Sequence, residues 1–161
     1  MYARDHARIA TPIGLVEIGG SESAIDSIRI GADGQALRGS ASAVLRAADQ
    51  LERWFAGELI AFDLALMPPH TQRGIDLRNG LIAIGYGETM SYGALARQLG
   101  SSPRAIGQLC ARNPFPIIVP CHRVLAGGGR LGNYSGGNGP VTKQWLLAHE
   151  QHHAKKQGTL L

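Results

Sequence analysis

The sequence predicts an α+β protein made of two small lobes. In the first part of the chain, short apolar runs rich in β-branched residues alternate with glycine and serine, whereas later apolar residues recur at helical spacing. The segment MPPHTQRG (67–74), with two prolines and several polar residues, lies between the two patterns. We therefore expect an N-terminal α/β lobe over 1–68, a C-terminal domain over 72–150 and a loose tail over 151–161.

The N-terminal lobe is predicted to be a small antiparallel sheet with one helix. Three segments have the residues of strands: 8–18, 25–30 and 62–67. In SAVLRAADQLERWF (42–55), apolar residues recur every three or four positions, which predicts a helix. Ser40 or Ser42 is expected to cap its start, and Gly57 is expected to end it.

The C-terminal domain is predicted to be mainly helical. Leu77, Leu81 and Ile84 share one helix face, and glycines at 85 and 87 close that helix. Ser91 is placed to cap the next helix, over 92–99. A Gly-Ser-Ser-Pro turn then leads directly into another helical run, over 104–111.

These last two helices match a helix-turn-helix in outline, although the spacing alone favours an ordinary helical hairpin. The second helix favours the DNA-binding interpretation. It carries Arg104, Gln108 and Arg112 at polar positions and contains no acidic residue. Its N-terminal turn could face phosphates.

Composition favours a folded protein with a polyanionic partner. Hydrophobic residues make up 44% and charged residues 17% of the 161, which argues against a largely disordered chain. The formal net charge of +4 suits nucleic acid, although many soluble proteins are equally basic. The first ten residues lack the apolar core of a signal peptide, and no stretch approaches the roughly 20 apolar residues of a membrane span. We expect a cytoplasmic monomer without a membrane partner.

Cysteine usage indicates a reactive thiol and not a scaffold. Cys110 and Cys121 are the only cysteines, and they form no CxxC pair of the kind found in zinc or redox sites. Cys110 lies in an apolar helical run and is predicted to pack in the core. Cys121 stands beside His122 in NPFPIIVPCHRV (113–124), where a neighbouring base or positive field could generate the thiolate. A buried structural cysteine fits that position equally well.

A glycine-rich segment, GGGRLGNYSGGNG (127–139), follows the cysteine. Within it, Asn133, Tyr134 and Ser135 have the side chains to hydrogen-bond a planar base. An ordinary surface loop has the same composition. The spacing of Gly127, Gly129 and Gly132 spells GxGxxG, but no helical run opens at its third glycine, which argues against a dinucleotide-binding fold.

Two other motifs allow alternative chemistries. His149, Glu150 and His153 spell the zinc-protease motif HExxH, but residues 154–161 contain no further ligand, so no metal site is expected. Cys121, His122 and Asn113 supply the residue types of a cysteine hydrolase. Such families draw the histidine from far along the chain, and this makes the hydrolase a secondary alternative.

At PCHRV the C-terminal half resembles the methylated-DNA–protein-cysteine methyltransferases, also called O6-alkylguanine-DNA alkyltransferases. Their signature combines PCHRV after an apolar run, RA(V/I)G upstream and a glycine-rich loop downstream, and this chain has all three. The similarity runs from Tyr86 through GETMSYGALA, PRAIGQLCARNPFPIIVPCHRV and LGNYSGG to WLLAHE, ending at Glu150.

The resemblance implies a direct-reversal repair protein that acts once on double-stranded DNA and needs no cofactor. Cys121 would accept a methyl or other alkyl group from O6 of guanine, with O4 of thymine as a further candidate. His122 would act through water as its base, and Glu150 would orient the imidazole. The implied fold is a ribonuclease-H-like N-terminal lobe followed by a winged helix-turn-helix.

Further roles carry over residue by residue from the same resemblance. Asn113 would brace the active-site turn, and Arg104 would fill the stack left by the flipped guanine. Tyr92 and Ser91 open the helix-turn-helix; the tyrosine would support rotation of the nucleotide and protonate the departing guanine. The base would be held by a set of loop residues: Asn133, Tyr134 and Ser135.

The chain departs from the family pattern at three points. Arg78 lies near a position usually occupied by Trp, and Gly85 replaces a Pro. The spacing from Cys121 to Glu150 is slightly longer than usual. A DNA-binding module that recognises the lesion without transferring the alkyl group is therefore the alternative from another functional class.

Overall fold

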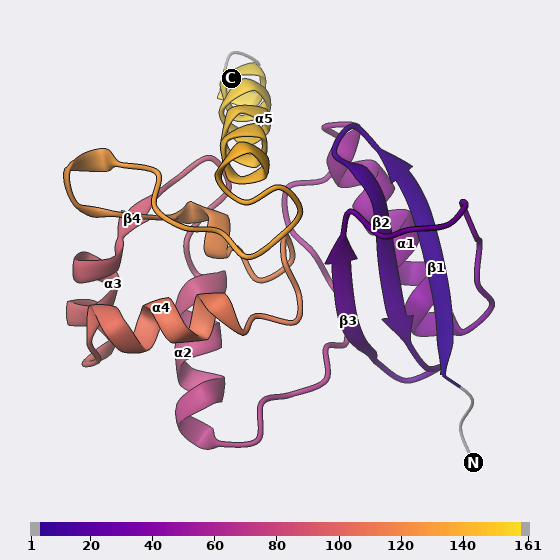
Figure 1. Cartoon of the computed structure of the whole chain (residues 1–161), viewed down its shortest axis with the longest axis horizontal. Helices are drawn as coiled ribbons and strands as arrows, with labels where there is room; N and C mark the ends of the chain where they lie inside the picture. Colours follow the sequence, from indigo (N-terminus) through magenta and orange to yellow (C-terminus); the bar gives the residue numbers. More distant parts are fainter. Residues whose placement is uncertain (1–3, 159–161) are drawn as a thin grey trace. The chain divides into compact units, whose positions relative to one another are not determined.

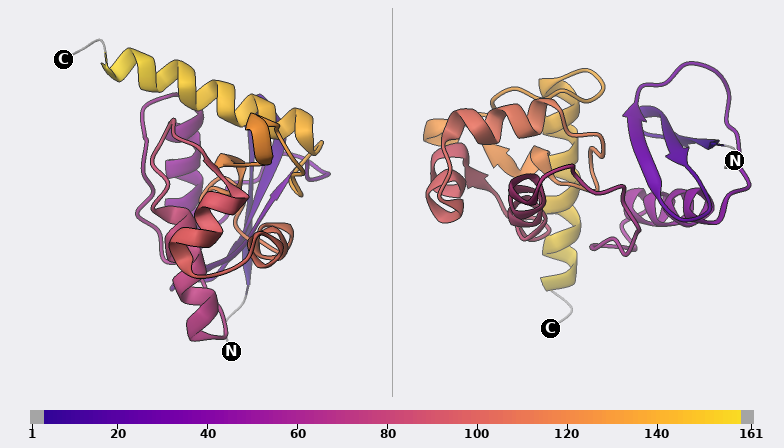
Figure 2. Two further views of the ribbon diagram at one scale, coloured as in Figure 1. Left: turned by 90° about the vertical axis from the view of Figure 1, so that its left-hand side faces the viewer. Right: turned by 90° about the horizontal axis from the view of Figure 1, so that it is seen from below.

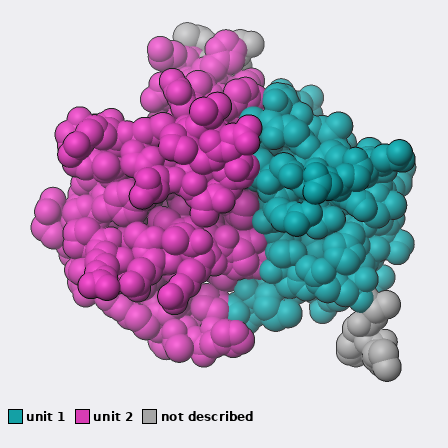
Figure 3. All heavy atoms as spheres, in the orientation of Figure 1, with its two compact units in different colours: residues 1–68 teal, residues 69–161 magenta. Residues whose placement is uncertain are grey.

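The computed structural model describes residues 4–158 and divides the chain into two compact units, Met1–Pro68 and Pro69–Leu161 (Figure 3). The architecture is α+β, with a three-stranded antiparallel sheet and five α-helices in the described residues. The boundary between the units falls within the proline-rich segment 67–74.

The first unit is built on a sheet in the order β1-β2-β3, formed by β1 (Asp5–Thr11), β2 (Gly14–Gly20) and β3 (Ile25–Ile30). The predicted segment 8–18 contains the turn of the β1–β2 hairpin, in which Ile9 pairs with Val16. Val16 and Ile18 are fully buried, as the two-residue period of a strand with one covered face requires.

Helix α1 (Ser42–Phe55) packs across one face of this sheet (Figures 1 and 2), as the helical periodicity predicted. Gly57, with a φ of 78°, follows its end as expected. The predicted serine caps are wrong, because the N-cap is Ala41. Carboxylates distant in sequence take their place: Asp5 accepts from the Ser40 and Ala41 amides at 2.7 and 2.8 Å, and Glu22 accepts from the Ser42 amide at 2.8 Å.

The strand predicted over 62–67 does not form. The chain makes an isolated parallel bridge there, with Leu66 opposite Ile25. Ile25 donates its amide hydrogen to the Ala65 carbonyl at 2.9 Å and accepts from the Met67 amide at 2.8 Å. Two such bonds hold the segment along the edge of β3 without extending into a ladder.

The second unit contains α2 (Gln72–Ile82), α3 (Tyr92–Leu99), α4 (Pro103–Ala111) and α5 (Pro140–Gly158) (Figures 1 and 2). Ser91 caps α3 as predicted, accepting from the Ala94 amide at 3.0 Å. Gly100 ends α3 in the left-handed conformation, and Ser102 caps α4. The α3–turn–α4 pair is the helix-turn-helix that the sequence predicted.

A short parallel pair, β4 (Met90–Ser91) and β5 (Val124–Leu125), ties the start of α3 to the segment after Cys121. Between them, the 3₁₀ turn η1 (Cys121–Arg123) carries the thiol. The glycine-rich loop follows β5 in the position of a wing and contains the 3₁₀ turn η2 (Gly127–Gly129).

The C-terminal residues are more ordered than the sequence predicted. The expected loose tail began at residue 151, but α5 continues to Gly158, and residues 159–161 lie outside the described part. Glu150 is fully buried. This burial anchors the helix. Within residues 4–158 no helix is both long and apolar enough to cross a membrane.

Candidate active site

Cys121 faces a cavity of about 570 Å³ in the second unit. Residues from α3, α4, η1 and the glycine-rich loop line it: Tyr92, Pro103, Gly107, Cys110, Ala111, Cys121, Ala126, Gly127, Gly132, Asn133, Tyr134 and Ser135. The cavity therefore brings the predicted acceptor together with Tyr92 and the three residues predicted to bind a base.

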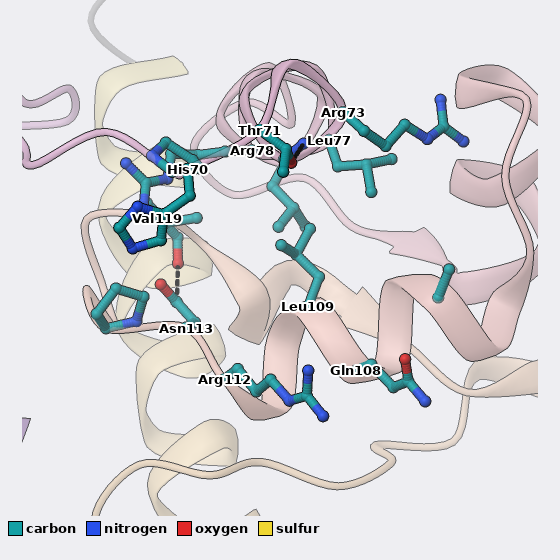
Figure 4. Close-up of a pocket in the computed structure, with 15 residues that line it drawn as sticks. His70, Thr71, Arg73, Leu77, Arg78, Gln108, Leu109, Arg112, Asn113 and Val119 are labelled. Atoms are coloured by element: carbon teal, nitrogen blue, oxygen red, sulfur yellow. Dashed lines mark hydrogen bonds between the residues drawn. The ribbon is translucent and has the colours of Figure 1, made fainter.

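Helix α4 separates this cavity from a second one of about 490 Å³ that lies against α2 (Figure 4). Positions 103, 107, 110 and 111 of α4 face the first cavity, whereas 105, 108, 109 and 112 face the second, as 3.6 residues per turn dictate. Figure 4 shows Leu77 of α2 and Leu109 of α4 on opposite sides of this second cavity. Gln108 and Arg112 thus lie apart from Cys121.

The segment before Cys121 forms a buried series of turns that ends in η1. Ile117 has a φ of 77°, which is strained for a β-branched residue, and such strain clusters at functional sites. Asn113 holds this segment in place. Its amide group donates to the Val119 carbonyl at 2.9 Å and to the Cys121 sulfur at 3.4 Å, while its carbonyl oxygen accepts from the Phe115 amide at 2.9 Å.

The η1 turn directs His122 away from the cavity into a buried ionic network. His122 Nε2 lies 2.9 Å from Glu150 Oε2, and Arg123 donates to the same carboxylate through Nε at 2.9 Å and Nη2 at 2.6 Å. Arg123 Nη1 also donates to the Ile84 carbonyl at 2.6 Å. His122 and Glu150 are fully buried. The longer spacing between Cys121 and Glu150 does not prevent this pairing.

The network fixes the charge states of its members. Burial alone would raise the pKa of Glu150, but the hydrogen bonds from His122 and Arg123 outweigh it and lower that pKa to about 2. Burial lowers the pKa of His122, against the pull of Glu150. An ionised Glu150 accepts a hydrogen bond, so His122 carries its hydrogen on Nε2. His122 Nδ1 is buried and has no partner among the described residues, which leaves it as a free base.

Cys110 is buried as predicted, yet it also lines the cavity together with Cys121. Its interaction with Cys121, helped by Lys143, lowers the pKa of Cys110. The same interaction, together with burial, raises the pKa of Cys121 well above its ordinary value. Because the two ionisations are coupled, the pair loses its first proton more readily than its second.

Lys143, on α5, is fully buried, a placement that lysine rarely adopts. Its Nζ donates to the Val124 carbonyl at 2.6 Å and to the Asn133 carbonyl at 3.2 Å, and lies 5.8 Å from the centre of the Tyr92 ring. The ammonium group therefore ties the cavity wall together and supplies the positive field that favours a thiolate.

Two tyrosines, Tyr92 and Tyr134, line the cavity. Burial raises the pKa of Tyr92 to about 12 and also raises that of Tyr134, so both remain proton donors at neutral pH. The Tyr134 hydroxyl is buried without a partner in the part of the chain that the structure describes. An unmet buried hydroxyl costs about 1–3 kcal/mol, which a ligand in the cavity could relieve.

The predicted DNA-binding residues divide by location. Arg104 is exposed in the first turn of α4, whose N-cap is Ser102 and whose first turn has no acid. Gln108 and Arg112 are exposed along the second cavity. The Ser91 hydroxyl is engaged as the α3 cap, and the Asn113 side chain is engaged in the active-site turn.

The geometry does not assemble either alternative chemistry. In the HExxH motif, His149 and His153 contact each other with ring centres 4.3 Å apart, but Glu150 points instead to His122 and Arg123. For a cysteine hydrolase, the asparagine would orient the histidine. Here Asn113 bonds the Cys121 sulfur, and Glu150 is the residue that orients His122.

Comparisons with known proteins agree with this geometry. The family model described as 6-O-methylguanine DNA methyltransferase, DNA binding domain, matches residues 77–152. The methylated-DNA–protein-cysteine methyltransferase of Mycolicibacterium paratuberculosis is 35% identical over 97% of this chain and 98% of its own length. The chain belongs to the methylated-DNA–protein-cysteine methyltransferase family.

Solved structures of this family support the fold over nearly the whole chain. The O6-methylguanine methyltransferase of Mycobacterium tuberculosis is 34% identical, with a TM-score of 0.77 over 94% of both chains. The same enzyme in complex with DNA is 36% identical, with a TM-score of 0.76 over 92% of this chain and 93% of that one. The predicted ribonuclease-H-like lobe and winged helix-turn-helix are thereby confirmed.

The departures from the family pattern have local explanations. The Arg78 guanidinium lies 5.1 Å from the centre of the Phe115 ring, so it packs against an aromatic face where a Trp is usual. Gly85 donates its amide hydrogen to Glu88 at 3.3 Å, which proline could not do.

Two residues of the site are not predicted by the sequence: Lys143, and Arg123 as an ionic partner of Glu150. Arg123 belongs to the PCHRV motif, but nothing in the motif indicates this ion pair. For Lys143 the available signal was its helical position, three residues before Leu146 on a buried face of α5. Lysine at such a position is ordinarily read as a solvated side chain.

Proposed function

We propose that this chain repairs alkylated double-stranded DNA by moving the alkyl group from O6 of guanine to Cys121, once per molecule. The observation that carries the proposal is the cavity that Cys121 lines together with Tyr134 and Ser135, with a free imidazole nitrogen on the residue next to Cys121. All the residues involved belong to 72–150, to which we assign DNA binding and alkyl acceptance.

The first step is extrusion of the damaged base. O6 of guanine is inaccessible inside a stacked duplex, so the nucleotide must rotate out at a cost of a few kcal/mol. The exposed Arg104 side chain enters the vacated stack, and the N-terminal turn of α4 faces the phosphates. Gln108 and Arg112 extend this contact along the outer side of the same helix.

The extruded guanine enters the cavity of Cys121. Tyr134 donates a hydrogen bond to it, and Asn133 lies at the same wall. The Ser135 hydroxyl, which donates to the Cys110 carbonyl at 3.4 Å in the empty cavity, turns to donate a second hydrogen bond to the base. Binding satisfies the Tyr134 hydroxyl, which is otherwise buried without a partner among the described residues. Binding of the base therefore removes the free-energy cost of leaving the Tyr134 hydroxyl without a hydrogen bond.

Transfer is a nucleophilic substitution at the alkyl carbon. His122 Nδ1 takes the Cys121 proton through a water molecule, and Asn113 and Lys143 stabilise the resulting thiolate. The sulfur forms a bond to the alkyl carbon as the carbon–O6 bond breaks. The electron pair of the broken carbon–O6 bond stays on guanine, which gains a proton from Tyr92. The proton held by His122 then returns Tyr92 to its neutral form.

The product is a thioether that no group in the cavity can cleave, so Cys121 is consumed. O4 of thymine presents a similar alkyl ether and is a candidate second substrate. We place the protein in the cytoplasm as a monomer, because its two free thiols persist in a reducing compartment and its site lies within one unit.

The test is intact-protein mass spectrometry after incubation with a duplex that contains one O6-methylguanine, followed by tryptic mapping. A gain of one methyl group per chain, located on the peptide 113–123, supports the proposal. Cys121→Ser is expected to abolish the gain but to keep duplex binding in a gel-shift assay, because the thiol contacts no phosphate. Tight binding with no mass change in the unmodified protein would identify a lesion-binding module instead.

A further inference from the structure

Two thiols, and not one, face the cavity of the proposed acceptor. Cys110 comes from the last turn of α4 and Cys121 from η1, both residues line the same cavity, and each shifts the pKa of the other. The active-site reaction described above uses only Cys121. The chemistry of the second thiol is therefore unassigned.

Asn113 forms a hydrogen bond with each of the two cysteine residues. Its backbone amide donates to the Cys110 carbonyl at 3.3 Å, and its side-chain amide donates to the Cys121 sulfur at 3.4 Å. The Ser135 hydroxyl also donates to the Cys110 carbonyl, at 3.4 Å. Asn113 thus contacts both cysteine residues, and Ser135 further fixes the backbone of Cys110.

We propose that Cys110 and Cys121 form a reversible disulfide when a peroxide enters the cavity. The inference rests on the proposed function in one respect: the disulfide would mask the alkyl acceptor. Because each chain acts once, irreversible oxidation of Cys121 would inactivate the protein before it had repaired any DNA. A neighbouring thiol instead traps the oxidised cysteine as a disulfide, which can be reduced.

The oxidation balances with hydrogen peroxide as the oxidant. One thiolate of the pair attacks a peroxide oxygen, the oxygen–oxygen bond breaks, and hydroxide leaves to become water with the thiol proton. The second sulfur then displaces hydroxide from the sulfenic acid, forms the sulfur–sulfur bond and releases a second water. Two small-molecule thiols reverse the reaction and become a disulfide themselves.

The electrostatics of the cavity favour this sequence. The interaction with Cys121 and the charge of Lys143 lower the pKa of Cys110, and the thiolate is the form that reacts with peroxide. The second thiol lies next to the first, so it can capture the sulfenic acid before a second peroxide does. The cavity of about 570 Å³ admits a molecule as small as peroxide.

The sequence makes the test direct, because arginines at 104, 112 and 123 place Cys110 and Cys121 on separate tryptic peptides, 105–112 and 113–123. The full chain is treated with hydrogen peroxide, and its intact mass and non-reduced tryptic map are recorded. The expected result is a monomeric chain that has lost two hydrogens, a cross-linked pair of these peptides, and methyl transfer that falls and then returns with dithiothreitol.

Cys110→Ala is the matched variant, and each protein is scored as the fraction of its own untreated transfer that dithiothreitol restores. Wild type is expected to recover most of its transfer, whereas the variant is expected to gain oxygen on Cys121 and to recover little. Equal recovery in both proteins, or oxygen addition without a cross-linked peptide in wild type, would overturn the proposal. Failure of the proposed function is distinguishable, because untreated protein would then transfer no methyl group while the cross-link could still form.

Discussion

The carboxylate of Glu150 lies 2.9 Å from Nε2 of His122, although the two residues are separated by 28 positions in the chain. This contact decides which imidazole nitrogen remains basic, because it engages Nε2 and leaves Nδ1 free. Arg123 and the Gly87 amide also donate to the same carboxylate, the latter at 3.4 Å. Glu150 thus positions the proposed base and joins α5 to the active-site turn.

The lowered pKa of Glu150 predicts an acid-dependent stability. Its pKa is about 2 in the folded chain against 4.5 ordinarily, so the unfolded chain takes up this proton first. The stabilisation is complete above pH 4.5 and is lost as the pH falls towards 2, by roughly 3 kcal/mol. Urea unfolding at a series of acidic pH values should show this loss in the unmodified protein.

Two variants separate this effect from the titration of other acids. Glu150→Gln is expected to lower stability at neutral pH by about 3–5 kcal/mol, because Arg123 loses its buried counter-charge, and to flatten the acid dependence. Glu52→Gln changes an exposed acid on α1 and should follow the unmodified protein. If Glu150→Gln and Glu52→Gln gave the same pH profile, the network would not carry the stability assigned to it.

Local signals in the sequence were sufficient for the elements that hold the site. Ser91 caps α3 through a bond to an amide three residues away, and the periodicity of 42–55 fixes α1. Both depend on neighbours along the chain. The PCHRV motif likewise located Cys121 and His122, although only the structure shows that η1 turns the two side chains in different directions.

The features that were missed depend on partners distant in sequence. Helix α1 is capped by Asp5 and Glu22, which no local pattern connects to Ala41. Segment 62–67 has strand residues, but only Leu66 finds a partner, so no ladder forms. Lys143 is buried because carbonyls from two other segments converge on it. Such convergence is a property of the tertiary structure.

Lys143 is predicted to set the pH at which transfer becomes fast. Lys143→Met removes a positive charge that lowers the pKa of Cys110 and favours the thiolate of Cys121. The first ionisation of the thiol pair should then shift to higher pH, and a shift of one pKa unit slows transfer at neutral pH by about tenfold. Single-turnover rates measured against pH should show that the transfer rate of Lys143→Met recovers in alkaline buffer.

Lys143→Arg is the control, because it keeps the charge and should retain more of the transfer rate at neutral pH. A loss of rate in Lys143→Met that does not depend on pH would point to a purely structural role.

Arg104 is predicted to assist base extrusion from duplex DNA and to have no part in the alkyl-transfer step. Arg104→Ala should slow repair of an O6-methylguanine duplex by about tenfold, because part of the unstacking cost of a few kcal/mol is no longer offset. Reaction with free O6-benzylguanine should change little, since the free base leaves no stack to refill. Arg53→Ala removes an exposed charge from the other unit and serves as the control. Equal losses on both substrates would refute the insertion of Arg104.

Gly107 is predicted to be needed for alkyl transfer although it lowers the stability of α4. It lies inside α4, where glycine is less favourable than alanine by about 1 kcal/mol, and a Cβ atom there would meet nothing within 4 Å. Neither the backbone nor the packing of the described chain therefore requires a glycine. Its position in the cavity wall supplies a reason, because a side chain there would fill the space that an extruded guanine needs.

Gly107→Leu should unfold at the same temperature or higher. It should nevertheless transfer the methyl group at least about tenfold more slowly, since small displacements of a reacting group are costly. Unchanged transfer in a stable Gly107→Leu protein would mean that the base does not enter beside α4.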